Sequence, residues 1–166
     1  MNGETLLPPD IEDLARRVIE LNRAAGRTVA LAESCTGGLV IGALTEIAGS
    51  SAVVDRGFVT YSNEAKQEML GVSPDLIDAF GAVSIACAWA MAQGALRHSG
   101  ADVAVAISGI AGPDGGSELK PVGTVVFARA VRGEDEVIAE ERLFPPTSRG
   151  EVRRQAVLVA LELLLP

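Results

Sequence analysis

The sequence has few histidines, cysteines and basic residues, and each shortage argues against a class of protein. His98 is the single histidine, and Cys35 and Cys87 are the two cysteines. They fit neither a disulfide framework nor the ligand spacing of a zinc site, so reduced thiols in a cytoplasmic protein are expected. Only 14 lysines and arginines stand against 22 acidic residues. They form no basic cluster, which argues against nucleic acid as a partner.

Long apolar runs are also scarce. The N-terminus lacks the basic start and apolar core of a signal peptide. The longest uncharged stretch, 79–96, is mostly Ala, Gly and Ser, and it predicts a buried helix rather than a membrane span. Nearly half of the chain is hydrophobic but only 4% is aromatic, a composition typical of helices packed closely on a buried sheet. One domain over 1–166 is expected, with 1–9 as a flexible tail.

Hydrophobic periodicity predicts strands that alternate with helices. The predicted strands cover 28–31, 57–61, 102–107, 122–131 and 136–144. The predicted helices cover, in chain order, 10–25, the segment from the Ser34 turn to 47, 62–71, a short helix from Ser73-Pro74, 84–97 and a last helix capped by Thr147-Ser148. The last two strands read as a hairpin, and strands joined through a helix should be parallel. The fold class is therefore α/β, a three-layer α/β/α sandwich with a mostly parallel sheet.

The segment Ala32–Gly38 reads as a tight turn between a strand and a helix. The first N–H groups of such a helix lack intrahelical partners and attract an anion or a developing oxyanion. Ser34 and Thr36 add hydroxyl groups, and Gly37 and Gly38 allow close approach. The alternative is structural: Ser34 or Thr36 is an ordinary N-cap, and the glycines ease packing.

Three segments should leave the sheet at the carboxyl edge of its parallel strands, where open α/β sheets bind ligands. They are Ser34–Gly38, Tyr61–Lys66 and Ser108–Gly116. Hydroxyl groups, one amine and many backbone N–H groups would then meet in one pocket. The sequence therefore predicts a functional site at this edge.

The type of chemistry follows from elimination. His98 comes just before the third predicted strand, at the opposite edge, so a Ser-His-Asp triad is excluded on geometry. If Ser34 is a nucleophile, its base is Lys66, with Tyr61 as a proton relay or orienting group. A base that works near neutral pH needs the pKa of Lys66 lowered by about 3 units, through burial or a nearby cation.

Alternatives exist for each of these residues. Lys66 could be a solvated helix lysine that pairs with a carboxylate such as Glu64 or Glu68. Cys35 is a rival nucleophile, or else a small buried hydrophobic residue. Asp114 with Glu118 could hold a magnesium ion, although acidic residues in a glycine-rich loop are usually solvated. Periodicity and spacing do not choose among these readings.

Several longer motifs resemble one known family. They are Ala32–Gly38, Tyr61-Ser62-Asn63 with Lys66, Gly81–Ser84, Ser108–Pro113 and Lys120–Val125. In this order they resemble the CinA C-terminal domain family, over nearly the whole chain. The resemblance implies a five-stranded mixed sheet in the order 2-1-3-4-5 with strand 4 antiparallel, and a homo-oligomer.

The resemblance also implies an activity: hydrolysis of nicotinamide mononucleotide to nicotinate mononucleotide and ammonia, with no cofactor or metal. It makes Ser34 the nucleophile and Lys66 and Tyr61 its catalytic partners. The residues it assigns to substrate binding are Thr36, Gly37, Gly38, Ser108, Gly109, Gly112 and Arg149. The Gly-Asp-Arg of the family is replaced here by Thr147-Ser148-Arg149, which keeps an arginine for the phosphate. The competing hypotheses are a non-catalytic nucleotide-binding module, a serine amidase for another amide, and a weak or inactive relative.

Overall fold

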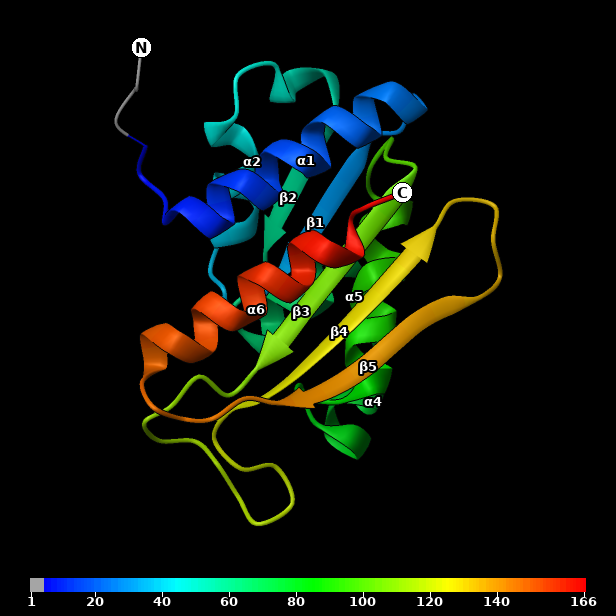
Figure 1. Cartoon of the computed structure of the whole chain (residues 1–166). Coiled ribbons are helices and arrows are strands. Elements are labelled where there is room, and N and C mark those ends of the chain that lie inside the picture. The colour runs from blue at the N-terminus through cyan, green and yellow to red at the C-terminus, as the bar shows by residue number, and fades with distance from the viewer. Residues whose placement is uncertain (1–4) are drawn as a thin grey trace.

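The structure, a computed structural model, describes residues 5–166. One five-stranded sheet lies between two layers of helices (Figure 1). In chain order the elements are α1 (Pro9–Ala25), β1 (Val29–Glu33), α2 (Leu39–Glu46), the 3-10 turn η1 (Ser50–Ala52), β2 (Val54–Val59), α3 (Asn63–Leu70), α4 (Pro74–Phe80), α5 (Ile85–Arg97), β3 (Val103–Gly109), β4 (Thr124–Val131), β5 (Val137–Leu143) and α6 (Arg149–Leu163). Of the predicted tail, 1–4 lie outside the described residues, and Pro9 already belongs to α1.

The strand order is β2-β1-β3-β4-β5, as predicted. β1 is parallel to both β2 and β3, whereas β4 is antiparallel to β3 and to β5. β1 and β3 are buried along almost their whole length, because helices cover both of their faces. The predicted α/β/α sandwich and the mixed sheet with an antiparallel fourth strand are confirmed.

Each face of the sheet has its own hydrophobic core. α1, α2 and α6 pack on one face around Leu31, Val105 and Phe127, and α3, α4 and α5 pack on the other around Ala104, Met91 and Leu70. α5 approaches α3 so closely that a Cβ at Gly94 would collide with the Leu70 carbonyl. The small residues of α5 therefore fix the position of α3.

Several boundaries differ from the prediction by two or three residues. β2 begins at Val54 rather than 57, because its pairing with β1 starts at Val29 opposite Val54. The helix from Pro74 and the helix over 84–97 are separate, as predicted, because Gly81, with φ +80°, ends α4 within the uncharged stretch 79–96. No helix within residues 5–166 has the length and apolar character that a membrane crossing requires.

The chain leaves β1, β2 and β3 at one edge of the sheet. Ser34 follows β1, Tyr61 and α3 follow β2, and the loop from Ile110 follows β3. The N-terminal end of α6 also reaches this edge (Figure 1). Four segments far apart in the sequence therefore surround one space.

Candidate active site

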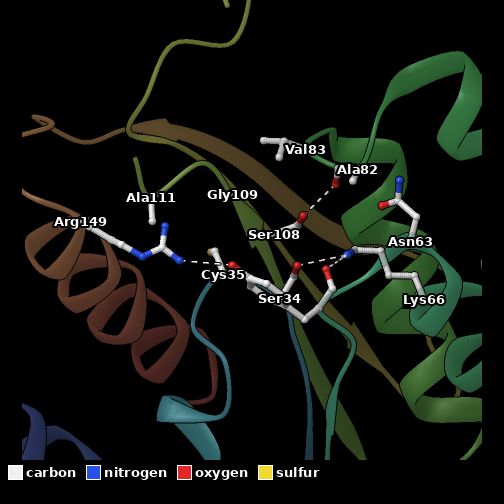
Figure 2. A pocket seen from close by; sticks show the side chains of 11 residues that line it. Ser34, Cys35, Asn63, Lys66, Ala82, Val83, Ser108, Gly109, Ala111 and Arg149 are labelled. Atoms are coloured by element: carbon white, nitrogen blue, oxygen red, sulfur yellow. Dashed lines mark hydrogen bonds between the residues drawn. The ribbon is translucent and has the colours of Figure 1, made fainter. Parts of the chain in front are cut away.

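A cavity of about 230 Å³ lies at the carboxyl edge of the parallel strands. Figure 2 shows Lys66 entering it from one side and Arg149 from the other, with Ser34 between them. The predicted site residues that line it are Ser34, Tyr61, Lys66, Ser108, Gly109 and Arg149. The structure thus brings together six of the ten site residues that the sequence predicts.

Lys66 extends from α3 to the Ser34 hydroxyl. Its side chain is only 1% exposed, and its Nζ lies 3.1 Å from Ser34 Oγ. The same Nζ donates to the carbonyl oxygens of Thr60, at 2.9 Å, and Tyr61, at 3.3 Å. Ser62 caps α3 by accepting from the Ala65 N–H, which fixes the first turn of the helix beneath Lys66. The reading of Lys66 as a solvated helix lysine is therefore wrong.

Burial lowers the pKa of the Lys66 amine below its ordinary value, because the charged form loses its hydration. Within residues 5–166, no carboxylate lies at ion-pair distance from its Nζ. Its contacts are neutral oxygens, which partly replace water without adding a negative charge. The neutral amine is thus favoured here more than on the surface.

Cys35, the rival nucleophile, is buried beside Ser34. Its side chain is 6% exposed, and burial raises the pKa of its thiol to about 12. Because the thiolate is the nucleophilic form of cysteine, Cys35 stays protonated and unreactive near neutral pH. The environment favours Ser34 over its neighbour.

Tyr61 contacts the site through two different groups. Its backbone carbonyl accepts from Lys66 Nζ, whereas its hydroxyl accepts from Arg149 Nη2 at 3.2 Å. In the described part of the chain, no hydrogen bond joins this hydroxyl to Ser34 or Lys66. A proton relay through the Tyr61 hydroxyl therefore has no hydrogen-bonded path in this structure. The backbone carbonyl of Tyr61 can serve the predicted orienting role, because it accepts from Lys66 Nζ.

Arg149 is the first residue of α6 and joins two of the converging segments. Besides Tyr61, it donates through Nη1 to the Gly112 carbonyl at 2.8 Å. Ser148 caps α6 by accepting from the Glu151 N–H, as predicted. The altered Thr147-Ser148-Arg149 segment therefore starts a regular helix with its guanidinium in the cavity.

Glu33 is the main residue that the sequence analysis missed. Its carboxylate, fully buried at the end of β1, accepts from the N–H groups of Val40 and Ile41 and from the Thr36 hydroxyl. The expectation of free N–H groups at the start of this helix is therefore wrong at Val40 and Ile41. The sequence shows only an acidic residue at the end of an apolar run, directly before the Ser34 turn, and no local pattern indicates its contacts with α2.

Four predicted substrate-binding residues do not line the cavity: Thr36, Gly37, Gly38 and Gly112. Thr36 is fully buried, and its hydroxyl is donated to Glu33. Gly37 and Gly38 have φ of +58° and +99°, so they shape the turn through a backbone conformation that glycine favours. Neither Ser34 nor Thr36 is the N-cap of α2; Gly38 is, without a side-chain bond.

Other residues complete the wall of the cavity. Ser108, the penultimate residue of β3, donates its hydroxyl to the Ala82 carbonyl at 2.8 Å, which ties the 82–83 loop to the sheet. The remaining lining residues, which the sequence analysis did not assign to the site, are Asn63, Ala82, Val83 and Ala111. Within residues 5–166, no three histidine, cysteine or acidic side chains gather as a metal site.

An α/β/α sandwich with a buried lysine amine on a serine hydroxyl has the arrangement of the Ser-Lys variants of nucleophilic sites. Comparison with known families agrees with the resemblance in the motifs. Residues 11–166 match the CinA C-terminal domain model, so the chain belongs to this family.

Individual relatives include enzymes and longer proteins. The chain is 53% identical over 156 residues to the nicotinamide-nucleotide amidohydrolase PncC of Escherichia coli K12, a match that covers 93% of each protein. It is 57% identical over 131 residues to a competence-damage inducible protein of Symbiobacterium thermophilum. That match covers 79% of this chain and only 31% of the longer relative.

Solved structures share the fold over nearly the full chain. The competence/damage inducible protein CihA from Agrobacterium tumefaciens superposes with a TM-score of 0.94 at 55% identity, over 97% of both chains. A CinA superfamily protein from Klebsiella pneumoniae 700603 has a TM-score of 0.87 at 40% identity, over 93% of this chain and 94% of its own. The family prediction is confirmed.

Proposed function

We propose that this chain hydrolyses the carboxamide of nicotinamide mononucleotide, releasing nicotinate mononucleotide and ammonia by acyl transfer on Ser34. The observation that carries the proposal is the buried contact of 3.1 Å between Lys66 Nζ and Ser34 Oγ. The amidohydrolase class and the substrate are supported by 53% identity to a relative named nicotinamide-nucleotide amidohydrolase.

Lys66 acts as the general base in its neutral form. A neutral amine has two N–H donors and one lone pair. The carbonyls of Thr60 and Tyr61 accept the two N–H groups, which leaves the lone pair for the Ser34 hydroxyl proton. The hydrogen bonds thus orient the base as well as hold it.

The reaction needs two acyl transfers, the first to Ser34 and the second to water. Ser34 Oγ bonds to the carboxamide carbon while its proton moves to Lys66, and the C–N bond then breaks as that proton goes to the departing ammonia. Water next attacks the acyl ester and gives a proton to Lys66, which returns it to Ser34 as the C–O bond breaks. The intermediate oxyanion needs nearby donors. The N–H groups of Cys35 and Thr36 directly follow the nucleophile, and within residues 5–166 neither has a backbone acceptor.

The basic groups of the cavity fit the phosphate of a nucleotide. Among the described residues, the basic ones that line it are Lys66 and Arg149, and Arg149 carries a guanidinium that pairs well with phosphate. The pyridinium ring withdraws electrons from the carboxamide and, close to Lys66, disfavours protonation of the amine. This second effect favours the nucleotide over free nicotinamide.

The test is ammonia release from nicotinamide mononucleotide by the parent protein and by Ser34→Ala and Lys66→Ala, with Lys120→Ala as the control. The expected result is release by the parent and Lys120→Ala, and a loss of about 1,000-fold or more in the other two. Release by all four proteins would refute the Ser-Lys mechanism but keep the activity. Binding without release by the parent would refute the proposed enzyme.

A further inference from the structure

The carboxylate of Glu33 forms a buried polar cluster with three hydrogen-bond donors, directly before the Ser34 turn. It accepts from Thr36 Oγ1 at 2.7 Å and from the N–H groups of Val40 and Ile41, each at 3.0 Å. Two of these donors belong to the first turn of α2, and the third belongs to the turn that carries Ser34. One side chain therefore connects the strand, the turn and the helix.

The charge of Glu33 is balanced by this helix terminus. Within residues 5–166, no lysine, arginine or histidine lies at ion-pair distance from its carboxylate. The N-terminus of a helix carries about half a positive charge, and here it faces the protein's own carboxylate. The N–H groups of Val40 and Ile41 at this helix terminus already donate to Glu33, so they are not free to bind the phosphate of a substrate.

The backbone around Ser34 is held from both sides of the turn. Glu33 O accepts from Thr60 N at 2.8 Å, and Ser34 N donates to Ile107 O at 2.9 Å. On the outer side, Arg153 of α6 donates to the carbonyls of Cys35 and Thr36, at 3.0 and 3.4 Å. Ser34 is thus fixed to both neighbouring strands and to two helices.

We propose that Glu33 is the positioning residue of the nucleophile: through the Thr36 hydroxyl and the first turn of α2, it holds Ser34 Oγ within reach of Lys66. The inference rests on the proposed role of Ser34. Glu33 itself does not line the cavity, so it acts on the geometry of the turn and not on the substrate. Its loss should affect kcat more than KM, because the substrate contacts remain in place.

The direct test is Glu33→Gln, a nearly isosteric change. A glutamine keeps one carbonyl acceptor but turns an NH₂ group toward N–H or O–H donors, so part of the cluster is lost. The matched control is Glu46→Gln, which removes one negative charge from the exposed end of the same helix. Thr36→Val removes only the Thr36 hydroxyl and leaves the α2 cap, so it tests the link to the turn even if Glu33→Gln unfolds.

Two readouts separate positioning from stability. The first is kcat and KM for nicotinamide mononucleotide, measured below the melting transition of each variant. The second is the rate at which phenylmethanesulfonyl fluoride modifies Ser34, followed by peptide mass spectrometry. The expected result for Glu33→Gln is a fall in kcat of about 10- to 100-fold, with KM within about threefold and an equally slower modification of Ser34. Glu46→Gln should match the parent.

The double variant sharpens the test. If Glu33 acts through Thr36, the losses in Glu33→Gln and Thr36→Val do not multiply in the double variant, because both break one cluster. Unchanged kcat and modification rate in folded Glu33→Gln, with only a lower melting temperature, would overturn the proposal. The proposal would also be overturned if the kcat losses of Glu33→Gln and Thr36→Val multiplied in the double variant. A parent that is modified at Ser34 but releases no ammonia would refute the proposed function, and the modification rates would still decide the role of Glu33.

Discussion

The chain contains only two lysines, Lys66 and Lys120, and they lie in contrasting regions. Lys66 is buried between α3 and the Ser34 turn, whereas Lys120 is on the loop between β3 and β4. Lys66 contacts two carbonyls and one hydroxyl. Lys120 forms an ion pair with Glu141, with both side chains partly exposed. Identical side chains thus meet opposite electrostatic environments.

The difference supports the proposed role of Lys66 as a base. Desolvation is the largest effect on the pKa of Lys66 and disfavours the ammonium; Glu64 acts in the opposite direction, but in the described chain no carboxylate lies at ion-pair distance from Lys66 Nζ. Lys120, by contrast, is partly exposed to water and pairs with the Glu141 carboxylate. Reactivity therefore comes from the packing of α3 against the sheet and α5, not from the residue type.

The largest effect is expected when Lys66 is replaced by arginine, a change that keeps the positive charge but removes the basic lone pair. The same change at Lys120 is the control. Lys66→Arg keeps a positive charge but cannot lose a proton near neutral pH. We expect kcat to fall about 1,000-fold or more in Lys66→Arg and to stay within about twofold in Lys120→Arg. Steady-state ammonia release measures both. Substantial activity in Lys66→Arg would mean that the site needs a cation at this position rather than a base.

The next effect is the pH dependence of activity. Since the neutral amine is the base, kcat/KM should rise with pH and level off above the lowered pKa of Lys66. Below that pKa, it should fall about tenfold for each pH unit. Labelling lysine with ¹³C at Cε gives two signals, and the one that disappears in Lys66→Met should titrate below the ordinary lysine value of about 10.4. Titration of that signal at the ordinary value would contradict the proposed base.

Comparison of the two regions also shows what sequence can predict. The motif that ends in Lys66 placed the amine at the correct edge, because a strand end, a cap at Ser62 and a helix are all visible in the pattern. No sequence pattern indicated that the Thr36 hydroxyl donates to Glu33. β1 is buried on both faces, so its residues show no alternation that would reveal where Glu33 points. The contacts of Arg153 depend on how α6 docks, and no local pattern encodes that.

A smaller effect is expected from Tyr61→Phe, which keeps the backbone carbonyl that accepts from Lys66. The change removes only the hydroxyl that accepts from Arg149. We expect kcat/KM to fall about 3- to 10-fold, mainly through KM, because Arg149 loses one of its two anchors. A loss of kcat of about 100-fold or more would instead give the hydroxyl the role of a proton relay. Steady-state kinetics of Tyr61→Phe beside Lys66→Arg distinguishes these outcomes.

The smallest effect concerns stability and follows from linkage. The folded state lowers the pKa of Lys66, so between that pKa and the value of about 10.4 for an exposed lysine the unfolded chain binds more protons. The free energy of unfolding gains a contribution that rises with pH in this window. Relative to Lys66→Met, both the parent and Lys120→Met should become more stable as the pH increases from neutral toward 10, because both keep Lys66. Denaturant unfolding of the three proteins at several pH values measures this difference, and a parallel trend in all three would place the titrating group elsewhere.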